Sequence, residues 1–168
     1  MKDNEQLYSI FIQSLLERKV YLHINEVGKT VKQNLEKKLV FDLEDKCINE
    51  GMVKKGSIKI VNYSPGNVMG EKICFHCVFE CFICNPVEGM LVECNVKTIT
   101  KAGVHCEYSD DDNSDFVPLH IFIARDHHFN NSKYTDLKEN DKLKCKIVGS
   151  RFELNDPYIT SIATMYNG

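Results

Sequence analysis

Five short segments in which apolar and polar residues alternate fill the second half of this chain. They cover residues 89–100, 103–108, 116–123, 142–151 and 158–165. Alternation of this kind predicts strands with one buried face, because successive side chains of a strand point to opposite sides. The longest connection, residues 124–141, lies between the third and the fourth segment. Five short antiparallel strands in this arrangement are typical of an OB-type Greek-key barrel.

The first half combines strand and helix signals. Residues 8–18 fit a helix or the start of a strand equally well, and residues 20–24 predict a short strand followed by a suitable helix cap, Asn25. Apolar residues then recur at every fourth position, which predicts an amphipathic helix over residues 26–43. Further strands are predicted within residues 51–56, 57–61 and 72–84. The sequence therefore predicts an α+β protein, with a small α/β domain at residues 1–85 and a five-stranded OB-fold β-barrel at residues 86–168.

Residues 62–70 predict a long loop, because they contain one proline, two glycines and two asparagines. The same segment carries the apolar side chains of Tyr63, Val68 and Met69. Apolar residues on an exposed loop indicate a surface for a partner.

Composition and charge exclude several classes of protein. No apolar run approaches the roughly 18–20 residues of a membrane span, and the acidic, polar start lacks the features of a signal peptide. An intracellular location is therefore expected, and there the eight cysteines are not expected to form disulfides. The net charge of −3 divides into +1 for residues 1–85 and −4 for residues 86–168. A free-standing nucleic-acid binder usually carries a basic excess, so this balance fits a component of a larger assembly better.

Two CxxC pairs suggest a zinc site and hence a zinc-dependent interaction module; they consist of Cys74, Cys77, Cys81 and Cys84. The intervening residues favour a strand rather than a tight turn, and residues three apart in a strand point to opposite faces. Only three residues separate the two pairs, whereas zinc sites usually leave about a dozen for the chain to return. The sequence therefore predicts a cysteine-rich core strand and no metal.

Signals for catalysis are weak. The adjacent His127 and His128 have no third ligand at a set spacing, and the neighbours His105 and Cys106 would face opposite sides of a strand. Phosphate-binding, dinucleotide-binding, zinc-protease and serine-hydrolase motifs are all absent from the sequence. We therefore expect a protein that is not an enzyme and needs no cofactor.

Nucleic-acid binding has more support, because OB barrels bind single strands through aromatic side chains and cations on their second and third strands and nearby loops. Alternation turns some candidates inward, and Phe122 is more typical of a core position than of a stacking platform. A barrel with a net charge of −4 is expected to bind RNA modestly and in a salt-dependent manner. The candidate RNA-binding residues are Lys97, Lys101, His105, Tyr108, Phe122, Arg125, His127, Lys144 and Arg151.

The order of several short motifs resembles one protein family. A Cys47-x-x-x-Gly51 element leads into a strand and then into the loop from Ser64 to Gly70. The β run Cys77-Val78-Phe79-Glu80-Cys81-Phe82-Ile83-Cys84-Asn85-Pro86 follows, and Val87-Glu88-Gly89 connects it to the next strand and the turn at Gly103. Over residues 20–165 the chain thus resembles the RNA polymerase stalk subunit family, which comprises an archaeal type and its eukaryotic seventh-subunit counterparts in multisubunit polymerases. Cys84 stands where the family usually has phenylalanine, which indicates a divergent member and is compatible with a virus-encoded one.

The resemblance implies a non-catalytic subunit of a DNA-directed RNA polymerase. Residues 1–85 would form a tip domain that docks on the large polymerase core subunits, and the barrel would contact nascent RNA weakly. A second small stalk subunit would pack along the junction of the two domains, and no membrane would be involved. The location would be the nucleus of a cell, or the host cytoplasm and the virion for a virus. The alternative is a stand-alone OB-fold factor that binds single-stranded RNA. The docking residues would be Tyr63, Ser64, Pro65, Gly66, Val68 and Met69.

Overall fold

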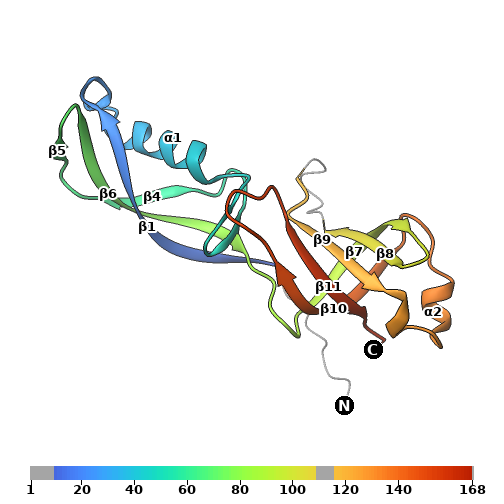
Figure 1. Cartoon of the computed structure of the whole chain (residues 1–168). Helices are drawn as coiled ribbons and strands as arrows, with labels where there is room; N and C mark the ends of the chain where they lie inside the picture. Colours follow the sequence, from blue (N-terminus) through green and yellow to red (C-terminus); the bar gives the residue numbers. More distant parts are fainter. Residues whose placement is uncertain (1–9, 109–115, 168) are drawn as a thin grey trace, which may run out of the picture.

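The computed structural model describes residues 10–108 and 116–167. They form an elongated molecule, with a sheet and a helix at one end and a barrel at the other (Figure 1). None of the described helices is long and apolar enough to cross a bilayer. The first region contains β1 (Phe11–His23), η1 (Ile24–Glu26), α1 (Val31–Leu43), β2 (Cys47–Ile48), β3 (Gly51–Val53), β4 (Lys59–Tyr63), β5 (Asn67–Met69) and β6 (Lys72–Cys84). The barrel region contains β7 (Leu91–Ile99), β8 (Gly103–Tyr108), β9 (Leu119–Ala124), η2 (Arg125–His127), α2 (Ser132–Thr135), β10 (Lys142–Arg151) and β11 (Ile159–Met165).

Strands β1 and β6 organise the first region. Each is 13 residues long, and they pair antiparallel without a register shift along their whole length. β6 also pairs with β3, β4 and β5, so it is the central strand of the sheet. Helix α1 covers one face, and its Leu35 and Leu39 share a buried cluster with Phe75 and Phe79 of β6.

The start of the chain differs from the prediction in two ways. The ambiguous residues 11–18 belong to the continuous strand β1, which also includes most of the short strand predicted at 20–24. The helix begins at Val31 rather than at residue 26, and Asn25 is not its cap. Residues 24–26 form a 3-10 turn instead, in which the Glu26 carboxylate accepts the His23 backbone N–H at 2.9 Å. Gly28 disfavours a helix, so residues 27–30 form a connection.

The prediction of a long loop at residues 62–70 was wrong in part. Tyr63 ends β4, and residues 67–69 form β5, which pairs with β6. Between the two strands, the Ser64 N–H donates to the His76 carbonyl oxygen at 2.9 Å, and the Ser64 hydroxyl accepts the His76 N–H at 3.0 Å. The long partner strand β6 therefore stabilises a short strand that the proline- and glycine-rich local sequence does not indicate.

The cysteines of the two CxxC pairs lie on β6 and are buried. Cys77 and Cys81 belong to the cluster beneath α1, whereas Cys84 belongs to the core of the barrel. Cysteines three residues apart thus point to opposite faces, as expected for a strand. Burial raises the pKa of Cys77 and of Cys81 to about 11, so both thiols stay protonated at neutral pH. All eight cysteines of the chain are in the reduced form, without disulfide bonds.

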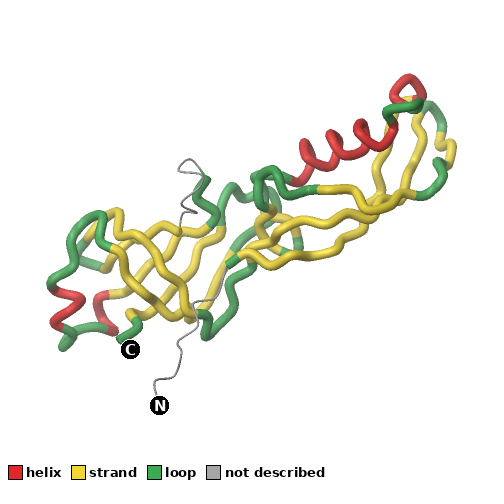
Figure 2. Tube along the Cα trace, turned by 180° about the vertical axis from the view of Figure 1, so that it is seen from behind, coloured by secondary structure: helices red, strands yellow, loops and turns green. Residues whose placement is uncertain are grey.

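The five strands of the second half close into a barrel in the order β10-β11-β9-β8-β7, with β7 paired back to β10 (Figure 2). They lie where the alternation predicted them. The prediction that all five pair antiparallel was wrong, because β9 and β11 run parallel. The chain leaves the end of β9 through η2 and α2, and β10 starts from that end and runs back. β11 then returns in the direction of β9, so the sheet is mixed.

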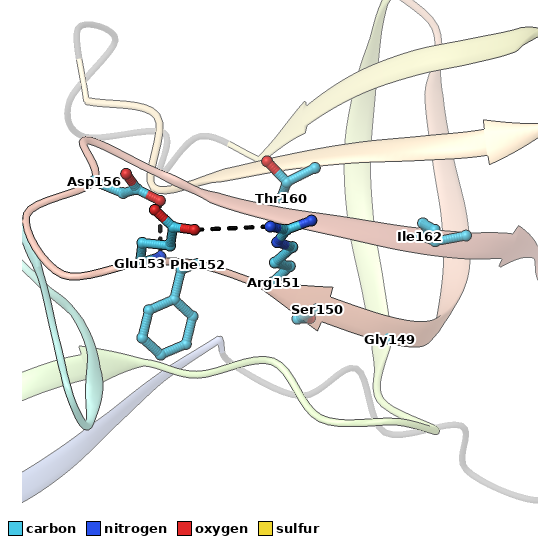
Figure 3. Close-up of a pocket in the computed structure, with 8 residues that line it drawn as sticks. All are labelled: Gly149, Ser150, Arg151, Phe152, Glu153, Asp156, Thr160 and Ile162. Carbon is cyan, nitrogen blue, oxygen red and sulfur yellow. Dashed lines mark hydrogen bonds and ion pairs between the residues drawn. The ribbon is translucent and has the colours of Figure 1, made fainter.

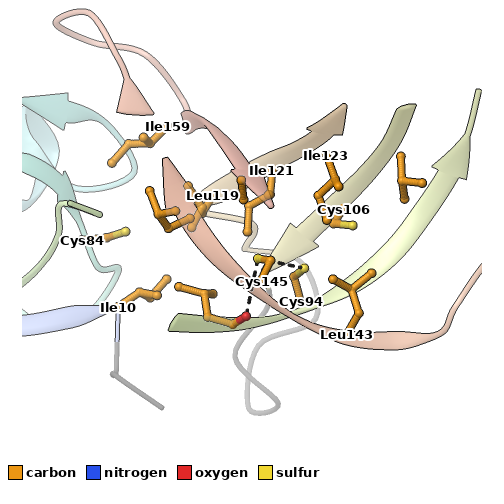
Figure 4. Close-up of a cluster of buried hydrophobic side chains, with 14 of the residues drawn as sticks. Ile10, Cys84, Cys94, Cys106, Leu119, Ile121, Ile123, Leu143, Cys145 and Ile159 are labelled. Atoms are coloured by element: carbon orange, nitrogen blue, oxygen red, sulfur yellow. Dashed lines mark hydrogen bonds between the residues drawn. The ribbon is translucent and has the colours of Figure 1, made fainter. Parts of the chain in front are cut away.

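The core of the barrel extends into the first region (Figure 4). The turn between β10 and β11 also bonds to β2: the Cys47 N–H donates to the Asp156 carbonyl oxygen at 2.9 Å, and the Asn155 N–H donates to the Cys47 carbonyl oxygen at 2.8 Å. The predicted boundary after residue 85 falls in the turn between β6 and β7, and the independence of the two domains stays a prediction. The residues of the first region that are buried with the barrel core are Ile10, Cys47, Met52 and Cys84.

Gly51 of β3 offers a test of this junction. Its φ of +136° is a conformation that other residues rarely adopt, and an added Cβ would collide with the Cys84 carbonyl oxygen. We expect Gly51→Ala to lower the free energy of unfolding by about 1–3 kcal/mol, measured by urea denaturation. Gly28→Ala is the matched control, because a Cβ there meets open space. Equal stability of the two variants would contradict the close contact.

Candidate nucleic-acid interface

The outer surface of β8 and β9 carries the polar and aromatic side chains that alternate with the barrel core. On β9, Ile121 and Ile123 are buried, whereas His120 and Phe122 point outward and are half-buried. On β8, His105 is exposed beside the buried Cys106. The antiparallel register places His105 opposite Phe122 and Glu107 opposite His120, so these outward side chains form two adjacent rows.

Two pairs of rings lie on this surface. The ring centroids of His105 and Phe122 are 4.9 Å apart, and those of His120 and Tyr158 are 4.1 Å apart. Tyr158 immediately precedes β11, which lies beside β9. Outward-facing rings on the second and third strands of an OB barrel provide surfaces on which unpaired bases can stack.

Cations surround the rings. The Lys97 ammonium lies 3.8 Å from one oxygen of the Glu107 carboxylate, and His120 Nδ1 lies 3.8 Å from the other. At one end, the Arg125 N–H donates to the Ala102 carbonyl oxygen at 3.0 Å, which joins η2 to the turn between β7 and β8. Exposed side chains at this end include those of Lys101, Arg125 and His127, together with the acidic Asp126.

The structure therefore brings together most of the predicted RNA-binding residues on one side of the barrel, and it separates Lys144 and Tyr108 from them. Lys144 lies on β10 opposite Glu93 of β7, away from β8 and β9. Tyr108 is half-buried and packs against the barrel core. Arg151 lies at the margin of the same outer face, in a groove between β10 and β11, because it is paired with Thr160, which is paired with His120. The interpretation of Phe122 as a core residue was wrong, because Ile121 and Ile123 occupy the inward positions of β9.

Sequence reasoning missed His120 and Tyr158. His120 could have been found by alternation, because it lies two residues before Phe122 and so shares its face. Tyr158 gives no such signal, since its contact with His120 depends on the parallel pairing of β9 with β11.

His128 has a structural role. It is buried, its Nδ1 lies 2.8 Å from the Ala124 carbonyl oxygen, and its Nε2 lies 3.0 Å from the Met165 backbone nitrogen. Since the Met165 N–H donates to Nε2, the proton of the neutral ring lies on Nδ1 and donates to Ala124. The ring also stacks on Tyr134, with centroids 5.2 Å apart. Both nitrogens are thus engaged, which leaves His128 unavailable to a metal or a substrate.

Inside the barrel, three cysteines from β7, β8 and β10 lie together: Cys94, Cys106 and Cys145 (Figure 4). The sulfur atoms of Cys94 and Cys145 are 3.8 Å apart. Hydrogen bonds to Cys106 and Cys145, followed by burial, raise the pKa of Cys94. The Cys94 thiol therefore stays protonated, whereas a metal ligand or a nucleophile must be a thiolate. Within residues 10–108 and 116–167, no group of three or more His, Cys, Asp or Glu side chains is arranged to hold a metal ion.

The predicted docking residues lie around β5, at the end of the sheet far from the barrel (Figure 1). Val68 and Met69 are 77% and 57% exposed. Tyr63 is half-buried and packs edge-on against Phe75, with centroids 6.3 Å apart. Ser64 bonds to β6, and a Cβ on Gly66 would collide with Ile73. The apolar surface thus belongs to Val68 and Met69, and the other residues of the segment hold its shape.

A closed five-stranded barrel preceded by a sheet with one helix defines a two-part α+β protein of the OB-fold class. No family model matches the sequence. The chain is 26% identical over 171 residues to a putative DNA-directed RNA polymerase subunit of Acanthamoeba polyphaga mimivirus, which covers 94% of this chain and 82% of the relative. It is 23% identical over 163 residues to the RNA polymerase II subunit RPB7 of Glycine max, over 88% of each chain. It is 25% identical over 118 residues to subunit 7 of RNA polymerase II from Arabidopsis thaliana, over 69% of this chain and 62% of the relative.

The chain is therefore similar, at low identity and over most of its length, to the RPB7-like family of RNA polymerase subunits. This confirms the family indicated by the sequence motifs. RPB7 is a non-catalytic polymerase subunit, in agreement with the prediction that this chain is not an enzyme.

The adjacent histidines give a matched pair of variants. His128→Phe removes two hydrogen bonds and leaves the Met165 N–H without its acceptor, so we expect it to lower the free energy of unfolding by about 1–3 kcal/mol. His127→Phe changes an exposed side chain and should alter stability by less than about 0.5 kcal/mol. Urea denaturation of both variants measures the difference. Similar losses for the two would contradict the structural role of His128.

Proposed function

We propose that this protein is a non-catalytic stalk subunit of a multisubunit DNA-directed RNA polymerase. It docks on the polymerase through the end of the sheet that carries β5, and it contacts emerging RNA through the outer surface of β8 and β9. The observation that carries the proposal is the similarity to polymerase subunits over up to 94% of the chain, which includes both regions of the fold. If the chain is encoded by a cell, its place of work is the nucleus. If it is encoded by a virus, it works in the host cytoplasm and is carried in the virion.

The apolar end of the sheet supports docking on large polymerase subunits. Val68 and Met69 project from β5, and Ile24 projects from the neighbouring turn η1 with 62% of its surface exposed. Burial of a large apolar side chain contributes about 1.5–3 kcal/mol, so a few such residues at one end can anchor the protein.

A second small stalk subunit fits the open side of the sheet. Helix α1 covers only one face, and on the other face Leu15 and Phe82 are exposed. Strand β1 forms an edge, because within the described residues it pairs with β6 alone. A partner that covers this face and pairs with this edge would complete the second layer that sheets in small domains usually have.

The docking proposal is tested by affinity purification of the tagged chain from its native source, with mass spectrometry of the recovered proteins. We expect two very large polymerase subunits with the unmodified chain. The double variant Val68→Asp, Met69→Asp should lower their recovery by about tenfold or more, because it places charges in an apolar interface.

The matched control is Val148→Asp, which changes an apolar residue that is 50% exposed on the barrel. Equal recovery with the double variant would refute docking through β5. Recovery of RNA and RNA-binding proteins without polymerase subunits would favour the stand-alone OB-fold factor.

The RNA proposal is tested by fluorescence anisotropy with a single-stranded RNA at low salt. Stacking of a base on a ring contributes about 1–3 kcal/mol, so Phe122→Ala should weaken binding by at least about fivefold. Phe82→Ala is the control, because it removes an exposed ring from the other region. Equal losses in the two variants, or no loss in Phe122→Ala, would count against the β8–β9 surface.

A further inference from the structure

A groove of about 630 Å³ lies on the outside of β10 and β11, next to the ring-bearing surface (Figure 3). Its floor is formed by Gly149 and Ile162, which are paired across the two strands. Because Gly149 has no side chain, the floor is hollow there, and an added Cβ would meet no atom within 4 Å. Ile162 is 52% exposed and supplies an apolar surface. The open space above Gly149 and the apolar surface of Ile162 can accommodate a flat, uncharged ring.

Hydrogen-bonding groups of both kinds line the rim. Arg151 and Thr160 supply donors, and Glu153 and Asp156 supply carboxylate acceptors. The Arg151 guanidinium lies 3.7 Å from the Glu153 carboxylate, and this exposed pair is weak enough to rearrange around a ligand. With two carboxylates and one guanidinium, the groove does not favour a phosphate. It suits an uncharged ligand with N–H donors along its edge.

The groove continues the ring-bearing surface. In the parallel pairing of β11 with β9, Thr160 lies opposite His120 and Ile162 lies opposite Phe122. Neighbouring strands are about 4.8 Å apart, so an RNA strand that stacks on His120 and Phe122 can place its next base in the groove.

We propose that the groove between β10 and β11 binds one unpaired base of the RNA and prefers a base with an exocyclic amino group to uracil. The inference rests on the proposed RNA contact of the barrel. Carboxylates accept hydrogen bonds from amino groups such as N4 of cytosine. The N–H of uracil is flanked by two carbonyl oxygens, which repel a carboxylate. Glu153 therefore favours cytosine, adenine or guanine in the groove.

The test compares labelled oligocytidylate and oligouridylate of about 12 nucleotides, which lies within the site size of an OB fold, by anisotropy at low salt. One additional hydrogen bond of ordinary net strength at this exposed site should make oligocytidylate bind about three- to tenfold more tightly. An added Cβ at Gly149 meets open space, so Gly149→Leu should fill the hollow and reduce this ratio to twofold or less while oligouridylate binding is kept. Glu153→Gln should also reduce the ratio. Gly28→Leu, a second glycine with open space around it, should leave the ratio unchanged.

The outcomes separate the groove from the proposed function. Binding of both oligomers with a ratio that Gly149→Leu does not change overturns the groove alone and leaves the β8–β9 surface in place. Failure of both oligomers to bind the unmodified chain overturns the proposed base site together with the proposed RNA contact. Polymerase docking is tested separately, by the affinity purification. Thermal unfolding of each variant confirms that the barrel is intact.

Discussion

The antiparallel pairing of β1 with β6 is the interaction on which the rest of the structure depends. An isolated pair of strands is at best marginally stable in water, and these two are separated by most of the first region. They are held by a third element, because α1 buries Leu35 and Leu39 against one face of the sheet. β6 then serves as the partner of every other strand of this sheet except β2. Cys84, the last residue of β6, is buried in the core of the barrel. The same strand therefore positions the exposed apolar residues of β5 relative to the barrel.

Local charge matters more than net charge at the candidate interface. The second half of the chain carries −4, a value that by itself argues against nucleic acid. Yet the surface of β8 and β9 combines rings with Lys97, Lys101 and Arg125, and the Glu107 carboxylate is shared between Lys97 and His120. At physiological salt, charges more than about 8–10 Å apart are largely screened. The cations beside the rings therefore attract a bound strand at short range, and the neighbouring Glu107 and Asp126 keep that attraction modest.

The sequence predicted secondary structure best for strands that bury one face and expose the other. The barrel strands could be predicted because apolar and polar residues largely alternate along them, and β6 because its residues favour an extended strand. The divergence of the CxxC pairs followed from strand geometry alone. β5 could not be predicted, because the preceding Pro65 and Gly66 indicate a turn. The strand forms because β6 is long enough to pair with it. The direction of β11 and the contact of Tyr158 with His120 depend on where the connection through η2 and α2 returns the chain. Such features arise from pairing between distant segments, which local patterns do not record.

The proposed role on a polymerase requires only a modest affinity for RNA. The apolar residues around β5 lie at one end of the molecule and the rings of β8 and β9 lie on the barrel at the other (Figure 1). A protein anchored at the first end holds the second near the transcript at a high effective concentration, which can strengthen a weak contact by orders of magnitude. Tight binding would instead retain each transcript as it emerges. A surface with a few rings and cations on a barrel of net negative charge is expected to bind RNA weakly and to release it readily. The acidic composition that argues against a free RNA-binding factor is thus the composition expected of a tethered one.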